Sequence, residues 1–504
     1  MDKAQKRLMS ESFDLQGTWF LPEQDMTKDG VEGILKYSPD KIVLELIGTF
    51  RGERDEMLYF LQQSPEKKTI YGFSNYGEKM SLFDCFSLGV KMNAPGFNTT
   101  SYIVNCFFAG TQFVNSNSER IIKSCEVSLT YLDAWLDTRI VDITTNQDTN
   151  NASILIDTER VSKNKKHITI DSENIMISEE LSRRIVYPKE YYSEETTKIV
   201  VNRFYKLSST NGELLYYDDC YDNLHKLRRL LALLIGSPLH FLFFDIEFVS
   251  EIIENEIEMK QHCRVFFTQV GNINKTQSIS PHKPGTVLIF RKDIIDSMED
   301  IFCNWFSLQE KLAEIVNPYI NDLYIQTYIE TIFLNTVRGL ETYHRYFPNE
   351  VSEEPQIIDA KFEEERTVLL SFIAERISDE NKQDFIDRIN YEDEGSLQKR
   401  LKELLRQTPT SLMERLFGKL NSKQTNKMIH AITQTRNYYT HRDDKQKYPL
   451  VIDNHNILNN YIKKLNVILQ YWVLRCIGIE GSLAEKSLIE HKKNNLAFST
   501  MIKN

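Results

Sequence analysis

The 504-residue sequence predicts an α+β protein, with a β-rich region over residues 1–290 and an all-α bundle over residues 296–490. Two observations predict this order. Short runs of β-branched and aromatic residues, separated by Asn, Gly, Pro and Asp, dominate the first half of the chain. From about residue 296, apolar residues instead recur with the period of an α-helix. The first region is therefore expected to form an antiparallel sheet or sandwich with some helix, and the second a helical bundle.

The β-rich region is expected to hold a series of strands and one long helix. The helix is predicted at residues 222–234, DNLHKLRRLLALL. Five aromatic residues could line a ligand surface, but such residues more often belong to a packed core. They are Trp19, Tyr71, Phe73, Tyr76 and Phe86. In chain order, the predicted strands are VEGILKY, KIVLELIGTF, TIYGFSNY, KMSLFDCFSL, TSYIVNCFFAG, IKSCEVSLTYL, ASILIDT, CRVFFTQVG and GTVLIF.

The second region is expected to hold a succession of helices, limited by prolines and caps. The first should end at Pro318 and the second at Pro348, because proline interrupts a helix. Ser411, which follows Pro409, is a predicted N-cap. In order, the predicted helices are IFCNWFSLQEKLAEIV, INDLYIQTYIETIFLNTVRGLETYHRYF, residues 360–390, SLQKRLKELLRQ, SLMERLFGKL, TNKMIHAITQTRNYYTH and HNILNNYIKKLNVILQYWVLRCIGI.

The cysteines and the most apolar stretch indicate a cytoplasmic protein. The seven cysteines are scattered, odd in number and free of CxxC spacing, which favours reduced thiols over disulfides or a zinc site. The N-terminus has no apolar run and predicts no secretory signal. Residues 230–244 are the most apolar stretch, but a membrane span needs about 20 residues. A buried helix followed by a buried strand is expected there, and no membrane segment.

Charge is distributed unevenly in the second region. The net charge of −11 argues against nucleic-acid binding over the whole surface, so any such site must be local. Residues 349–395 carry 15 Asp or Glu and 5 Lys or Arg, whereas residues 396–447 carry 12 Lys or Arg and 4 Asp or Glu. The basic block suits a phosphodiester substrate. The basic block is also compatible with an ordinary solvent-exposed helix face, whose positive charge is offset by the negative charge of the acidic segment before it.

The basic block ends in RNYYTH, which places Arg436 five residues before His441. Comparable spacings of an arginine before a histidine occur three times in the chain, so spacing alone does not select this pair. The three pairs are Arg160 with His167, Arg338 with His344, and Arg436 with His441.

The context favours Arg436 and His441. They lie at the end of a predicted helix, and Asn437 lies four residues before His441, so that both share a face. Glu341 and Arg345 form a second pair, also four residues apart, on an earlier helix of the same region. Such a pair is equally typical of an ordinary surface ion pair.

A helical bundle with E-x-x-x-R on one helix and R-N-x-x-x-H at the end of a later helix resembles the HEPN superfamily. LNTVRGLETYHRYF followed by TQTRNYYTHRD is similar in particular to the HEPN domain of ApeA-like anti-phage proteins. FDLQGTWFLPEQ, VEGILKY and IVLELIGTF resemble the N-terminal domain that accompanies it. The two resemblances together cover most of the chain.

The resemblance implies a metal-independent endoribonuclease that acts in abortive infection on cellular RNA, transfer RNA among its targets. It implies Arg436, His441 and Asn437 as catalytic residues, Glu341 and Arg345 as supporting residues, and no cofactor. A homodimer or higher homo-oligomer is expected, in which two motifs face each other in one cleft. The N-terminal domain is expected to sense infection, with a phage-derived trigger, or to restrain the nuclease.

The residue types fit this chemistry. RNA carries its own nucleophile, the 2′-OH. A histidine titrates in the range that suits a general base or acid, and an arginine offers a fork of donors to phosphate oxygens. The chain lacks the HExxH, CxxC and DxDxDG motifs that hold metals, so no metal is expected.

Two alternatives remain open. Asp245 followed by Glu258 and Lys260 resembles the D…ExK pattern of metal-dependent nucleases, whose acids lie at strand ends, but EIIENEIEMK predicts a charged helix. A HEPN domain can also be a non-catalytic module that binds RNA or nucleotides or serves another protein. The chain has neither a Gly-rich phosphate loop nor GxSxG, so NTP-driven action and serine hydrolysis are unsupported.

Overall fold

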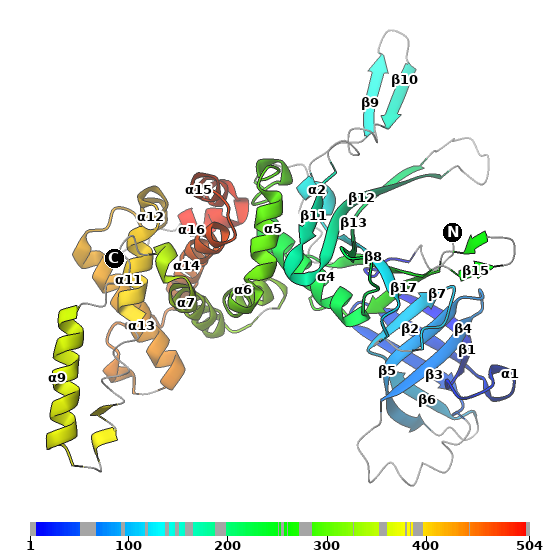
Figure 1. Ribbon diagram of the computed structural model, residues 1–504, viewed down its shortest axis with the longest axis horizontal. Coiled ribbons are helices and arrows are strands. Elements are labelled where there is room, and N and C mark those ends of the chain that lie inside the picture. Colours follow the sequence, from blue (N-terminus) through cyan, green and yellow to red (C-terminus); the bar gives the residue numbers. More distant parts are fainter. Residues whose placement is uncertain are drawn as a thin grey trace. The chain divides into compact units, whose positions relative to one another are not determined.

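The computed structural model forms two compact units, Met1–Phe306 and Ser307–Asn504 (Figure 1). The predicted order, a β-rich region followed by a helical region, is confirmed. The structure describes residues 7–50, 67–91, 96–115, 119–136, 141–146, 151–156, 165–186, 198–249, 251–253, 257–259, 261–271, 285–325, 327–351, 360–378, 381–383, 385–386, 397–442 and 444–499.

Six antiparallel strands of the first unit close into a ring. Their order is β5-β4-β1-β2-β3-β6, and pairing of β6 with β5 completes the circle. β5 can close the ring because it is long: residues 79–83 pair with β7, and residues 86–91 pair with β6. The strands are β1 (Phe13–Phe20), β2 (Val31–Ser38), β3 (Lys41–Ile47), β4 (Lys68–Ser74), β5 (Lys79–Lys91), β6 (Thr99–Ile103) and β7 (Cys106–Gly110).

The sheet continues beyond the ring as an open antiparallel layer (Figure 1). One long helix, α4 (Tyr217–Ile235), packs on it: Tyr217 contacts Phe108 of β7 and Phe244 of β14, and Tyr221 contacts Phe267 of β17. From β7 outward the strands are β17 (His262–Phe267), β14 (Phe241–Phe248), β8 (Ile122–Leu129), β13 (Lys198–Ser209), β12 (Ile175–Val186) and β11 (His167–Ile170). The predicted helix at residues 222–234 is confirmed as part of α4. Of the five aromatic residues, Trp19 and Tyr71 are buried as expected of core residues, Phe73 and Phe86 are half-buried, and the expectation is wrong for Tyr76, which is exposed.

Two local predictions in this unit are wrong. The segment EIIENEIEMK is not a helix, because β15 (Glu251–Ile253) and β16 (Ile257–Met259) pair as antiparallel strands. The segment has two short runs that contain isoleucine, separated by Glu-Asn-Glu. This pattern is typical of a hairpin, whereas its many charges had suggested a helix. GTVLIF is not a strand: its Leu288 and Ile289 N–H groups donate to the carbonyls of Ile235 and Leu234, so the segment covers the end of α4.

The first unit also contains the short elements α1 (Met26–Asp29), α2 (Leu132–Leu136), η3 (Asp171–Glu173) and η5 (Arg291–Asp293). A further strand pair is formed by β9 (Val141–Asn146) and β10 (Asn151–Ile156). The helix α5 (Met298–Ser307) ends at the boundary of the unit, and its Trp305 donates from Nε1 to the carbonyl of Lys226 at 2.9 Å. This bond attaches α5 to α4.

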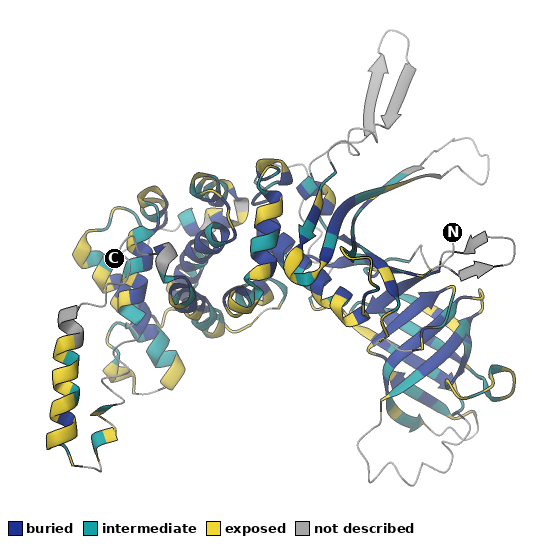
Figure 2. Cartoon of the chain, in the orientation of Figure 1, coloured by how far each residue is buried: buried dark blue, intermediate teal, exposed yellow. Residues whose placement is uncertain are grey.

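The second unit is built around α7 and α14, which carry more of its buried residues than any other two helices (Figure 2). They approach closely at Gly339, where an added Cβ would lie 3.0 Å from Leu469, and at Tyr343, whose ring lies 5.8 Å from that of Trp472. The helices are α6 (Gln309–Tyr324), α7 (Ile329–Tyr346), α8 (Pro348–Val351), α9 (Ala360–Arg376), α11 (Leu397–Gln407), α12 (Thr410–Phe417), α13 (Ser422–His441), α14 (His455–Cys476), α15 (Gly481–Glu490) and α16 (Asn495–Ser499).

Several predicted helix limits in this half are wrong or only partly described. The first predicted helix is split into α5 and α6, and α6 continues past Pro318, because Ile320 beyond the proline is buried in the core. The second predicted helix, INDLYIQTYIETIFLNTVRGLETYHRYF, is divided between the end of α6 at Tyr324 and α7 from Ile329. Ser411 is not an N-cap: α12 begins at Thr410, and the Ser411 hydroxyl bonds Glu485 instead. The helix predicted at 360–390 is observed as α9, and part of the remainder lies outside the described residues.

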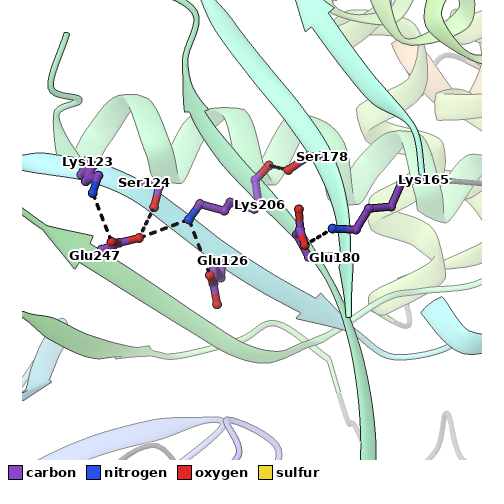
Figure 3. A network of polar contacts seen from close by, with 8 residues as sticks. All are labelled: Lys123, Ser124, Glu126, Lys165, Ser178, Glu180, Lys206 and Glu247. Atoms are coloured by element: carbon purple, nitrogen blue, oxygen red, sulfur yellow. Dashed lines mark hydrogen bonds and ion pairs between the residues drawn. The ribbon is translucent and has the colours of Figure 1, made fainter. Parts of the chain in front are cut away.

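A network of charged side chains crosses strands β8, β13 and β14 (Figure 3). Glu247 accepts hydrogen bonds from Lys206 Nζ at 3.2 Å and Ser124 Oγ at 3.0 Å, and Lys123 Nζ lies 3.5 Å away. Glu126 lies 4.0 Å from Lys206 Nζ. The pKa of Glu247 is lowered: burial alone would raise it, but the hydrogen bond and the charge of Lys206 outweigh burial. The pKa of Glu126 is raised, because burial outweighs the opposing charge of Lys206.

Glu126→Gln should therefore stabilise the first unit at pH 7. Because the folded chain raises the pKa of Glu126, the stabilisation from its protonation is complete below about pH 4 and is lost as the pH rises through the raised value. Glutamine removes the cost of the buried charge at pH 7. We expect a gain of less than about 1 kcal/mol in unfolding free energy, since a third of the side chain is exposed.

The matched variant is Glu247→Gln, on the neighbouring strand. The pKa of Glu247 is lowered, so its stabilisation is present above its unfolded pKa and is lost as the pH falls. This variant should destabilise the chain at pH 7. Thermal unfolding at pH 7 and at about pH 4 would measure both, and equal losses for the two variants at pH 7 would contradict this interpretation.

Candidate active site

The helix α13 carries RNYYTH and has a well-defined beginning and end. A capping box starts it: Gln424 N–H donates to Asn421 Oδ1 at 2.9 Å, and Asn421 N–H donates to Gln424 Oε1 at 3.0 Å. The helix ends at His441, because Arg442 adopts a left-handed conformation with φ of 53° and its N–H donates to the Tyr438 carbonyl. RNYYTH therefore forms the last turns of a capped helix.

The segment after α13 is bonded back to it. The N–H of Leu450 donates to Gln434 Oε1 at 2.8 Å, and the N–H of Ile452 donates to Thr435 Oγ1 at 2.9 Å. Thr435 is fully buried. These bonds hold the exposed end of α13 in place relative to the start of α14.

Three arginines from three helices share the carboxylate of Glu341 on α7. Arg436 Nη2 on α13 lies 3.4 Å from Oε2, Arg400 Nη1 on α11 lies 3.2 Å from Oε1, and Arg345 Nη2 on α7 lies 3.7 Å from Oε1. The Glu341 side chain is 15% exposed, and the exposed fractions of the arginines are 7% for Arg400, 33% for Arg436 and 49% for Arg345. Three positive charges on one negative charge leave this cluster cationic.

Arg436 also contacts its neighbour in the sequence. Its Nη1 donates to Asn437 Oδ1 at 3.1 Å. Asn437 and His441 are one helical turn apart and share a face of α13. Contacts thus connect four of the five predicted residues, namely Glu341, Arg345, Arg436 and Asn437. His441 is exposed at the helix end, and its imidazole is hydrogen-bonded to no side chain in the described part of the chain.

The other two arginine–histidine pairs differ from this one. On α7, Arg338 is exposed, whereas His344 is buried and its Nε2 lies 2.6 Å from Glu403 Oε2 on α11. His167 lies on β11, and Arg160 lies outside the described residues. None of the described members of these pairs, Arg338, His344 and His167, forms an ion pair with Glu341.

Arg400 is the member of the cluster that sequence reasoning missed. It lies in SLQKRLKELLRQ, directly before Leu401 and one turn before Leu404, both of which are fully buried. An arginine on the apolar side of an amphipathic helix is rarely buried without a charged partner. That position was the available signal, but the partner could not be named before the helices were placed.

Further basic residues lie on α11, along α13 from its start to its end, and on the segment that follows. They are exposed, and so can meet a polyanion: Lys399, Lys402, Lys423, Lys427, Arg442 and Lys445. Tyr438 lies among them, with its ring 6.1 Å from that of Tyr448. The surface combines positive charge with aromatic rings near the end of α13.

The residues of the D…ExK pattern are placed differently. Glu258 lies on strand β16, so the helix that argued against this pattern does not exist. Asp245, however, is held by Arg264, whose Nε and Nη2 lie 2.6 and 2.7 Å from its two oxygens. Among the residues whose positions are described, no group of three or more His, Cys, Asp and Glu could hold a metal ion.

The cysteines and the apolar helices were both subjects of predictions from the sequence. All seven cysteines are free thiols. The helices within the described ranges include none that is long and apolar enough to span a membrane.

Comparison with known families assigns both units. The family model of the ApeA N-terminal domain 1 matches residues 14–305, and that of the Apea-like HEPN domain matches residues 334–482. The second range contains Glu341, Arg345, Arg400, Arg436 and His441. No curated protein and no solved structure matches the chain. The chain belongs to the ApeA family, in which an ApeA N-terminal domain precedes an Apea-like HEPN domain, and it is a HEPN-domain anti-phage protein.

Proposed function

We propose that the chain is a metal-independent endoribonuclease that cleaves cellular RNA, transfer RNA among its targets, in abortive infection. The observation that carries this proposal is the shared carboxylate: Glu341 holds Arg345, Arg400 and Arg436 in one cationic cluster at the end of α13. A site that stabilises the extra charge on a phosphate in the transition state needs such oriented donors. The last turn of α13 carries Asn437 and His441, next in the sequence to Arg436 of this cluster.

The reaction requires a base, an acid and a cation. The base removes the proton from the 2′-OH, O2′ attacks the phosphorus, and the 5′-oxygen leaves with a proton from the acid. The products are a 2′,3′-cyclic phosphate and a free 5′-OH, and no water or metal enters this step. His441 acts as base or acid, and Arg436 donates to the phosphate oxygens. Asn437 orients Arg436, while Glu341 and Arg345 support it.

The second acid–base group comes from a second copy of the chain. One His441 cannot hold both roles at once, so two motifs facing each other in a homodimer or larger homo-oligomer would divide them. The exposed position of His441 at a helix end supports this arrangement, because a partner can reach it. Exposed lysines on α11 and α13 bind the RNA backbone, and Tyr438 stacks on a base.

The N-terminal domain restrains the nuclease and responds to a phage-derived trigger. An uncontrolled ribonuclease harms its own cell, and a fused domain is a direct means of control. The protein is proposed to act in the cytoplasm, which agrees with its seven free cysteines.

His441→Ala should abolish RNA cleavage. The purified full-length chain and this variant would be incubated with total cellular RNA, EDTA and extract from phage-infected cells, which supplies the trigger, followed by a denaturing gel and analysis of the RNA ends. We expect discrete cuts with cyclic phosphate ends from the wild type, and a loss of at least about 100-fold in the variant, since a general acid or base contributes on that order.

His430→Ala is the matched control, because His430 is exposed on the same helix and its Nδ1 contacts only Gln398 among the described residues. It should cleave like the wild type. Inhibition by EDTA would instead indicate a metal-dependent nuclease. RNA binding without cleavage, unchanged in His441→Ala, would favour a non-catalytic RNA-binding module.

A further inference from the structure

We infer that Arg400, on α11, is a positioning residue of this site: it holds one oxygen of Glu341 so that Arg436 stays available to the RNA phosphate. The inference rests on the proposed function and extends it to a third helix. Neither R-N-x-x-x-H on α13 nor E-x-x-x-R on α7 includes this residue.

Arg400 acts from inside the protein. Its side chain is 7% exposed, compared with 33% for Arg436, so Arg436 faces the solvent side of the shared carboxylate and Arg400 the core side. Leu401 and Leu404, which follow Arg400 by one residue and by one turn on α11, are fully buried. A substrate phosphate can therefore reach Arg436 but not Arg400.

Of the three arginines around Glu341, Arg400 and Arg436 lie closest and contact different oxygens, while Arg345 lies 3.7 Å from Oε1. Arg400 Nη1 lies 3.2 Å from Oε1, and Arg436 Nη2 lies 3.4 Å from Oε2. With Oε1 held on the core side, Arg436 meets only one oxygen of Glu341. Without Arg400, the carboxylate can turn to bind Arg436 through both oxygens, the geometry that arginine and carboxylate prefer. The donors of Arg436 would then be occupied by Glu341 rather than by the phosphate.

The position of Arg400 is fixed by a second contact between the same helices. Three residues after Glu341 on α7, His344 Nε2 lies 2.6 Å from Glu403 Oε2, three residues after Arg400 on α11. On both helices the two contacts are thus three residues apart, which is almost one helical turn. Both Arg400 and His344 are buried, so α11 is held in register against α7 at the level of Glu341.

Contacts connect α11 to the neighbourhood of His441 in a continuous series. Arg400 contacts Glu341, Glu341 contacts Arg436, and Arg436 Nη1 donates to Asn437 Oδ1 at 3.1 Å. Asn437 shares its helix face with His441. A change at Arg400 thus reaches the reacting groups through Glu341 and Arg436, without contact with RNA.

The experiment compares Arg400→Met and Arg400→Lys in the full-length chain. Kinetics of RNA cleavage would be measured with wild-type and His441→Ala proteins alongside, together with binding of a 2′-O-methyl RNA that cannot be cleaved. We expect Arg400→Met to lower kcat by about 10- to 100-fold, the range expected when a reacting group is misplaced by about 1 Å. KM and the Kd for the uncleavable RNA should stay within about twofold, because Arg400 does not touch RNA and the bond from Arg436 to the phosphate strengthens mainly in the transition state. Arg400→Lys keeps the charge and should recover part of kcat.

Leu405→Ala separates positioning from stability. Leu405 is buried on the same helix, and its truncation destabilises the fold without altering Glu341. At a temperature where all variants are folded, Leu405→Ala should keep the wild-type kcat.

The outcomes are distinguishable. An unchanged kcat in Arg400→Met would overturn the inference and leave the proposed function intact. A rise in the Kd for uncleavable RNA equal to the loss of kcat/KM would overturn it as well, because Arg400 would then contact the substrate. A similar kcat loss in Leu405→Ala would reduce Arg400 to a structural role. Absence of cleavage by the wild type in the presence of extract from phage-infected cells would overturn the proposed function, and this inference with it.

Discussion

Replacing Glu341 with glutamine should lower the unfolding free energy of the helical unit by about 3 kcal/mol, because it leaves buried positive charge without its counterion. Glu341 is the carboxylate shared by Arg345, Arg400 and Arg436. Glutamine has nearly the same shape but no charge, so Arg400 would stay buried among leucines with much weaker compensation. For a unit of this size, the loss corresponds to a fall in melting temperature of roughly 6–12 °C.

The same substitution should also remove RNA cleavage, since glutamine has no negative charge and only one oxygen to share between Arg400 and Arg436. Calorimetry of the full-length chain would measure the transition of the helical unit, and the gel assay would measure cleavage at a temperature where the variant is folded. Glu314→Gln is the control, because Glu314 is an exposed carboxylate on α6 that accepts a hydrogen bond from Tyr346 at 2.8 Å. Its effect should be below about 1 kcal/mol. Equal effects of the two substitutions would show that the cluster does not depend on Glu341.

The parts of the fold that could be predicted from the sequence are those specified by local patterns. The strand series and α4 follow from period and turn residues, and α13 from its apolar stripe. The errors occur where tertiary contacts override such patterns. Pro318 does not end α6, because residues beyond it are packed in the core, and GTVLIF covers the end of α4 instead of pairing as a strand.

The candidate site shows the same limit. Glu341 with Arg345, and Asn437 with His441, are four residues apart, so helix geometry alone places each pair on one face. The meeting of Glu341 with Arg436 and Arg400 joins residues 95 and 59 positions apart. It depends on how α7, α11 and α13 pack, which no local pattern specifies. The catalytic roles of Arg436, Asn437 and His441 stay predictions until cleavage is measured.

Glu179→Gln should be the most destabilising conservative change in the first unit, whereas the same change at the next residue, Glu180, should have little effect. Glu179 on β12 binds Arg291 through both oxygens: Nε and Nη2 lie 2.6 Å from Oε1 and Oε2. Both side chains are almost completely buried. Glu180 points to the other face of the strand and pairs with the partly exposed Lys165 (Figure 3).

The two variants should differ greatly in unfolding free energy, because the contribution of an ion pair to stability depends on its burial. Breaking a buried pair by removing one charge costs about 3–5 kcal/mol, whereas a surface pair contributes about 1 kcal/mol or less. A second buried arginine, Arg203, adds to the cost: burial lowers its pKa, and the charges of Asp133 and Glu179 oppose that shift. Thermal unfolding of both variants would measure the contrast, and losses of similar size would refute it.

The Glu179 variant should also loosen the segment between the sheet and α5. Arg291 lies in η5, after β17 and before α5, so its bond to Glu179 holds the chain just before α5 against β12. Hydrogen exchange should therefore become faster in η5 and at the start of α5 in Glu179→Gln but not in Glu180→Gln. Unchanged exchange there, together with a lower melting temperature, would mean that Glu179 stabilises β12 alone and that other contacts, such as the bond from Trp305 to Lys226, anchor α5.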